Sequence, residues 1–170
     1  MRLYAAKIPQ MSDEIVRALQ TAKAVEIESR AEVVKDIESV FSSYSATEKQ
    51  VTERARDMAQ SRNLPSSELA RIRGLEAERR GIKLGDDMLD HLLDQLIEML
   101  MHSSNVDEVF AEDHELRRTM RPVLRKHLDE DTVVEQEVRA KLKHVQEGTR
   151  TWEIEYQRMM GEIQRRRGLV

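Results

Sequence analysis

The segment DDMLDHLLDQLIEMLMH carries residue types that could bind a metal. Its carboxylates and imidazoles recur every three or four residues, at Asp87, His91, Asp94, Glu98 and His102. This spacing places them on one stripe of a helix. Carboxylate and imidazole groups bind divalent transition metals, so a metal-dependent enzyme is one hypothesis for this chain.

The same stripe has a simpler interpretation as a solvated acidic face. The opposite side of the helix carries Leu89, Leu93, Leu96 and Leu100. If these leucines pack into a core, the polar stripe points to water. Carboxylate metal sites in helical bundles instead use Glu and His side chains that point inward from separate helices. We therefore predict an acidic surface with no bound metal and no cofactor.

A second charged stripe follows in HELRRTMRPVLRKH. His114, Arg118, Arg121 and Arg125 share one helical face, and Arg117 lies at its edge. Arginine side chains bind carboxylates and phosphates through two parallel hydrogen bonds, which suits an anionic partner. Three interpretations stay open, namely pairing with the acidic stripe, docking of an acidic protein partner, and RNA binding. RNA recognition also favours exposed aromatic side chains, and the nearby Phe110 is expected in the core.

Residues 105–118, NVDEVFAEDHELRR, connect these two stripes. We expect Val106, Val109, Phe110 and Leu116 to pack inward. Glu112 and Asp113 then stand at a helix N-terminus, where carboxylates complement the backbone dipole. Asp113 and His114 are residue types that can form an acid–base pair, but no Ser, Cys or Thr nucleophile motif accompanies them. The preferred interpretation is a helix start that presents a charged surface.

Composition limits the function classes further. The chain has 170 residues, no cysteine, 35% charged and 4% aromatic residues, and a net charge of −4. The lack of cysteine excludes disulfides and thiolate metal sites, and the negative charge argues against general nucleic-acid binding. No stretch approaches the length of a membrane span, and no signal peptide is recognisable, so a cytoplasmic protein of the bacterial type is expected.

The apolar pattern predicts an all-α fold of two tandem three-helix units. Helices are expected near residues 10–22, 31–44 and 47–62 in a first unit spanning 1–62. A linker over 63–86 holds a short helix near 67–80, and a second unit over 87–170 has helices near 87–102, 112–127 and 132–166. Possible capping boxes at Ser29–Glu32, Ser45–Glu48 and Thr132–Glu135 mark three of the starts. Pro122 is expected to bend or restart its helix.

The two units align with each other, first at an offset of 81 residues and then at 83. The offset pairs Met11 with Leu92 and Phe41 with Leu124, and every aligned core position is apolar in both copies. The pairs keep helical spacings of 3 and 4. We therefore predict an internal duplication in which residues 8–59 superpose on 89–142. The charged stripes lie only in the second copy and are not needed for the repeated fold.

The predicted C-terminal helix has an unusually long apolar seam, from Val134 to Ile163. Such a seam must be covered by the rest of the chain or by a second chain, so a homodimer through this helix is possible. Gly148 interrupts the pattern and could break it. Trp152 and Tyr156 lie one turn apart on the seam. Core packing is the favoured role for both, and if exposed they would anchor a partner.

Three segments carry a resemblance to a known family: MRLYAAKIP at the start, NVDEVFAEDHELRR, and EGTRTWEIEY near the end. With them the whole chain, up to RRRGL, resembles a bacterial family of conserved small cytosolic proteins catalogued only as a domain of unknown function. The resemblance implies no activity, cofactor or catalytic residue.

The residues therefore favour a non-enzymatic adaptor or assembly factor with a protein partner. An RNA- or ribosome-associated protein using the arginine stripe is the alternative, and a metal-dependent enzyme is the third hypothesis. The partner-binding candidates are His114, Arg117, Arg118, Arg121, Arg125, Trp152 and Tyr156.

Overall fold

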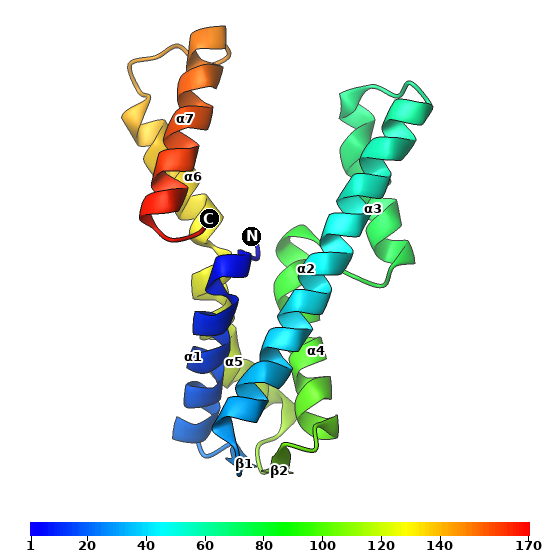
Figure 1. The fold of residues 1–170 in the computed structure, drawn as a ribbon, viewed down its shortest axis with the longest axis vertical. Coiled ribbons are helices and arrows are strands. Elements are labelled where there is room, and N and C mark those ends of the chain that lie inside the picture. Colours follow the sequence, from blue (N-terminus) through cyan, green and yellow to red (C-terminus); the bar gives the residue numbers. More distant parts are fainter.

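The computed structural model describes residues 1–170 and consists of helices with one two-stranded sheet (Figure 1). Its elements are α1 (Ile8–Thr21), β1 (Val25–Ile27), α2 (Arg30–Ser61), α3 (Leu69–Arg79), α4 (Met88–His102), β2 (Val106–Val109), α5 (Asp113–Leu128), α6 (Glu130–Lys141) and α7 (Arg150–Arg166). The predicted all-α class is confirmed. None of the helices combines the length and the apolar character that crossing a membrane requires.

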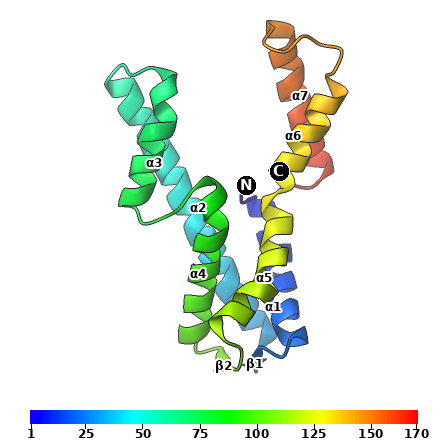
Figure 2. The same ribbon diagram turned by 180° about the vertical axis from the view of Figure 1, so that it is seen from behind.

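Four helices form a base from which two helical arms diverge (Figures 1 and 2). The base packs α1, α4, α5 and the first half of α2 around one apolar core. Leu19, Phe41, Leu96 and Leu124 in this core are fully buried, so residues of both predicted units build it together. The second half of α2 pairs with α3 to form one arm, and α6 pairs with α7 to form the other.

The small sheet joins the two halves at the tip of the base. β1 and β2 run antiparallel, with Val25 opposite Val109 and Glu26 opposite Glu108. These strands were not predicted from the sequence. Three or four residues are too few to show a clear alternation of apolar and polar positions, which is the usual sign of a strand.

Phe110 directly follows β2, and its predicted core position is wrong because its side chain is 58% exposed. Its backbone N–H donates to the carbonyl of Ala24 at 2.9 Å, so the strand pairing fixes the chain at this point. Successive side chains of an extended segment point to opposite sides. Since Val109 packs against the core, Phe110 turns outward. Leu116 is buried as expected.

The predicted break between residues 44 and 47 is absent, because α2 is one continuous helix. Ser45–Glu48 is therefore no capping box. The hydroxyl of Thr47 donates to the carbonyl of Ser43 within the helix, which satisfies it without ending the helix. No Gly or Pro occurs between Arg30 and Ser61 to stop the helix. Ser29 does occupy the N-cap position of α2, but its side chain makes no capping hydrogen bond.

The predicted helix over 132–166 is wrong, since the chain folds back between α6 and α7. Gly148 has a φ of +83°, a conformation that glycine adopts without strain, and it lies in the connecting loop. The apolar residues from Val134 to Ile163 thus pack against each other across a helical hairpin of α6 and α7. Thr132–Glu135 lies inside the first turns of α6 and is no capping box. Dimerisation through this region stays a prediction.

Pro122 lies inside α5 without a restart of the helix. Proline has no N–H, so the carbonyl of Arg118, four residues earlier, lacks its usual helical donor. Both halves of the chain share the order helix, strand, long helix. Most aligned apolar pairs are buried in both halves, as are Met11 and Leu92. The superposition of residues 8–59 on 89–142 stays a prediction.

Replacing Phe41 with Ala tests the importance of the shared core. We expect Phe41→Ala to lower the free energy of unfolding by about 3–5 kcal/mol, because a fully buried ring leaves a cavity when removed. Leu75→Ala is the matched control, since Leu75 is 54% exposed, and it should change stability by less than about 0.5 kcal/mol. Urea denaturation followed by circular dichroism measures both. Equal effects of the two changes would contradict the assignment of the core.

Candidate functional site

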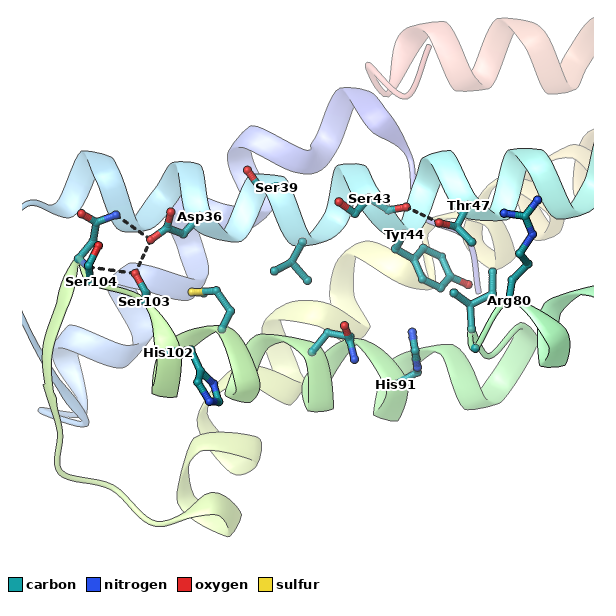
Figure 3. A pocket seen from close by; sticks show the side chains of 16 residues that line it. Asp36, Ser39, Ser43, Tyr44, Thr47, Arg80, His91, His102, Ser103 and Ser104 are labelled. Atoms are coloured by element: carbon teal, nitrogen blue, oxygen red, sulfur yellow. Dashed lines mark hydrogen bonds between the residues drawn. The ribbon is translucent and has the colours of Figure 1, made fainter.

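The acidic stripe of α4 divides between two neighbouring helices. On one flank, Arg117 donates to Asp94 at 2.6 Å, and Arg121 forms an ion pair with Asp90. On the other flank, His91 and His102 line a groove against α2 (Figure 3). The prediction that the whole stripe faces water is therefore wrong for His91, which is half-buried. Asp87 and Glu98 are exposed as expected.

The groove between α2 and α4 has a volume of about 710 Å³. On the α2 side it is lined by small hydroxyl residues spaced four apart, Ser39, Ser43 and Thr47, and on the α4 side by His91, Gln95 and His102. The groove was not predicted from the sequence. The signal that could have revealed it is the run SVFSSYSAT, because so many hydroxyl side chains are unusual inside a helix.

Most polar groups of the groove already have partners within the chain. At one end, Ser103 and Asn105 donate to the carboxylate of Asp36, at 2.5 and 2.9 Å (Figure 3). Near the other end, the Tyr44 hydroxyl donates to the carbonyl of Lys83 at 2.8 Å. The hydroxyl of Ser39 bonds to its own helix. The bonds of Asp36 and Tyr44 tie α2 to the segments that follow and precede α4, so these polar groups have a structural role.

His91 packs against Tyr44, with ring centroids 5.8 Å apart. Burial lowers the pKa of His91 below its ordinary value, so the neutral ring predominates at pH 7. His91 points toward α2 while Asp90 and Asp94 engage α5. Accordingly, no three His, Asp or Glu side chains of the chain are arranged to hold a metal ion.

The start of α5 is held by a reciprocal capping arrangement. The N–H of Glu112 donates to the carboxylate of Glu115 at 2.9 Å, while the Glu112 side chain accepts from the backbone of the first turn. Asp113 instead binds Arg117 at 2.6 Å, and this hydrogen bond lowers the pKa of the Asp113 carboxyl. His114 lies 3.4 Å from Glu112 on the exposed surface. The structure thus does not pair Asp113 with His114.

The basic stripe of α5 is half paired and half free. Arg117 and Arg121 form ion pairs with carboxylates of α4, and the hydrogen bonds that Arg117 donates to Asp113 and Asp94 raise its pKa. Arg118 and Arg125 are exposed, and neither takes part in any ion pair of the chain. Internal pairing with α4 therefore holds for Arg117 and Arg121, whereas Arg118 and Arg125 face solvent.

A buried polar cluster at the α1–α5 contact was not predicted. His127 is only 4% exposed, and its Nε2 lies 3.0 Å from the Glu14 carboxylate, which Lys126 also binds. Burial acts to raise the pKa of Glu14, but hydrogen bonds from His127, Gln10 and Lys126 outweigh it and lower the pKa to about 2. Because the carboxylate is ionised, His127 must donate the hydrogen bond. The sequence signal was the position of His127 on the apolar face of α5.

Trp152 and Tyr156 lie in the α6–α7 arm. Their rings stack with centroids 4.8 Å apart, and the guanidinium of Arg139 lies 5.9 Å from the Trp152 ring. Both side chains are partly buried against the small core of this hairpin. They are distant in the fold from the α5 stripe, so the predicted binding residues do not form one site (Figure 1).

The comparisons with known proteins give a family and no activity. The family model described as Protein of unknown function (DUF507) matches residues 1–169, so the chain belongs to this family. No curated protein matches the chain.

The divided stripe leads to a prediction about metals. We expect purified protein to contain no stoichiometric zinc, iron or manganese, because the α4 side chains do not converge. Elemental analysis before and after chelation, with thermal melting on the same samples, measures this. A stoichiometric metal whose removal lowers the melting temperature would contradict it.

The Glu14–His127 cluster predicts an acid-sensitive contribution to stability. A carboxyl with a lowered pKa stabilises the fold above its ordinary pKa of 4.5 and loses this contribution as the pH falls toward about 2. Glu14→Gln should therefore cost at most about 3 kcal/mol at pH 7. The difference from the unmodified protein should shrink below pH 4.5, as measured by denaturation at several pH values.

Glu98→Gln is the matched control, because Glu98 is exposed and its carboxylate has no ion pair. It should leave the pH profile unchanged. A Glu14→Gln protein as stable as the unmodified one at pH 7 would show that the cluster does not stabilise the fold.

Proposed function

We propose that the chain is a non-enzymatic cytoplasmic interaction protein, an adaptor or assembly factor, that binds an acidic protein surface through α5. The observation that carries the proposal is the pair of exposed arginines, Arg118 and Arg125, that have no carboxylate partner in the chain. An arginine without an internal partner can offer its full set of donors to another molecule. His114 lies on the same face and is 70% exposed at its side chain.

The surroundings of these arginines support a protein partner more than a nucleic acid. The sheet strands and the start of α5 are rich in carboxylates, including Glu26, Glu108 and Asp113. Such a field repels a phosphate backbone over the length that RNA binding requires. A protein partner needs only a short acidic patch to contact the two arginines, so it meets these carboxylates over a smaller area than RNA does.

Reversing the charge of the two free arginines tests the proposal. Arg118→Glu with Arg125→Glu should leave the melting temperature nearly unchanged, because exposed and unpaired charges contribute little to stability. The same change should weaken binding of the co-purified partner by at least about tenfold, because like charges then meet at the interface. Affinity purification from the native cell, followed by titration of the identified partner, measures this effect.

The control is Arg62→Glu with Arg150→Glu, which changes the net charge equally at two exposed arginines far from α5. It should leave binding intact. Retained binding in the α5 variant, equal loss in both variants, or a large loss of stability would each overturn the proposal. A partner removed by ribonuclease, with an affinity that falls steeply with salt, would replace it with RNA binding.

A further inference from the structure

A small hollow lies beside Arg118, between the end of α1 and the start of α5. It has a volume of about 230 Å³. Its apolar walls are Ala22, Ala24, Phe110 and Ala111, and its polar walls are Lys23, Glu115, Arg118 and Thr119. A cavity of roughly 150 Å³ accommodates a benzene ring, so this hollow can take a large apolar side chain. Its most exposed apolar wall is Phe110, at 58%.

The backbone around the hollow is fixed before any partner arrives. The carbonyl of Ala24 accepts hydrogen bonds from the N–H groups of Phe110 and Ala111, at 2.9 and 3.2 Å. Lys23 adopts a left-handed conformation with φ of +53°, held by a 3.0 Å bond from its N–H to the Gln20 carbonyl. A rigid site loses little conformational entropy when it binds, which favours recognition by this surface.

The two cations of the hollow, Lys23 and Arg118, form no ion pair, and the cap of α5 explains this for Arg118. Glu115 is three residues before Arg118 and could neutralise it, but its carboxylate accepts the Glu112 N–H in the cap of α5. At the aligned positions of the first half, Glu32 does neutralise its cation and binds Lys35 at 3.0 Å. The cap therefore leaves Arg118 unpaired, and Lys23 also takes part in no ion pair.

The aligned place in the first half is one end of the α2–α4 groove, and polar side chains bond to each other there. There Asp36 binds Ser103 and Asn105, the polar groups that fill the end of the α2–α4 groove (Figure 3). In the second half, Thr119 corresponds to Asp36. Ala22 and Ala24 correspond to Ser103 and Asn105. Thr119 turns back to bond the Glu115 carbonyl, and the alanines are too small to fill the space. The second half thus lacks the polar clamp at this place and has instead a hollow with both apolar and charged walls.

We infer that this hollow binds an acidic segment of a protein partner, with one bulky apolar side chain against Phe110 and flanking carboxylates on Lys23 and Arg118. The inference rests on the proposed function and names the chemistry of the partner. The apolar walls match the side chain, and the two unpaired cations match the carboxylates. Aromatic and arginine residues together dominate the binding energy of many interfaces.

A peptide of the stated chemistry tests the inference directly. The probe is a fluorescein-labelled peptide of Glu and Leu residues with one central Phe. It should bind saturably in fluorescence anisotropy and shift the amide signals of Ala24, Phe110 and Ala111 in a nitrogen–proton correlation spectrum. A peptide with Lys in place of Glu, and one with Ala in place of Leu and Phe, should not bind. Binding of either with the same shifts, or no binding of the first peptide, overturns the inference.

Variants of the protein separate the apolar and the charged parts of the site. Phe110→Ala should lower the affinity for the peptide about tenfold. Leu75→Ala removes a similarly exposed apolar side chain from α3 and should leave this affinity unchanged. Lys23→Glu with Arg118→Glu should abolish binding. All three variants should keep the melting temperature, since the changed side chains are exposed.

The outcomes distinguish this inference from the proposed function. One outcome is that Arg118→Glu with Arg125→Glu abolishes binding of the cellular partner, while Phe110→Ala leaves the affinity for the peptide unchanged. The α5 surface then binds its partner without the hollow. Another outcome is that the peptide binds as described, while the arginine changes leave binding of the cellular partner unchanged. The proposed function is then wrong, and the inference about the hollow is supported. If a single-stranded RNA oligonucleotide produces the shifts and the peptide does not, the class of partner is wrong.

Discussion

Burial of the leucine-rich face of α4 fixes the positions of the α2–α4 groove and of the carboxylates that bind α5. Leu92, Leu93 and Leu96 are fully buried in the core that both halves of the chain share. Because the leucines occupy one side of the helix, the remaining positions must flank α2 on one side and α5 on the other. His91 is thereby placed in the groove, and Asp94 is placed within reach of Arg117. The division of the acidic stripe is a consequence of core packing.

The number of available carboxylates limits how many cations of α5 can form ion pairs. Asp90 and Asp94 engage two arginines, and the N-terminal cap of α5 engages Glu115. Each of these carboxylates has one dominant partner, so arginines that seem equivalent on a helical wheel become different in the fold. Arg118 and Arg125 form no ion pair in the fold, and this difference from Arg117 and Arg121 is a property of the tertiary structure.

The helical period of the apolar residues was enough to predict the fold class and most helix positions. α1 and α4 lie close to their predicted bounds because their apolar spacing is regular and Pro or Gly residues lie near their starts. The break in α2 was wrongly predicted because Ser45 and Glu48 look like a helix start, whereas a hydroxyl can also bond within a helix. The seam of α6 and α7 was recognised, but periodicity does not show that a chain reverses at Gly148.

The candidate site was less accessible from the sequence. The residue types of the α5 stripe indicated an anionic partner, but the choice between paired and free arginines depends on distances between helices. Phe110 was predicted to lie in the core because large apolar residues are usually buried. The backbone hydrogen bond to Ala24 instead fixes the chain so that this side chain points outward. The Glu14–His127 cluster joins α1 to α5 across most of the chain, a separation at which local patterns carry no information.

The two arms also differ in how they can form. The arm of α2 and α3 joins segments that are neighbours in the sequence. The small core of the α6–α7 arm instead includes Tyr4, from the segment before α1, together with Leu169 at the far end of α7. A contact between such distant residues carries a high loop-closure entropy and forms slowly. During synthesis, Tyr4 therefore emerges long before its partners, and the second arm can be completed only as one of the last events of folding.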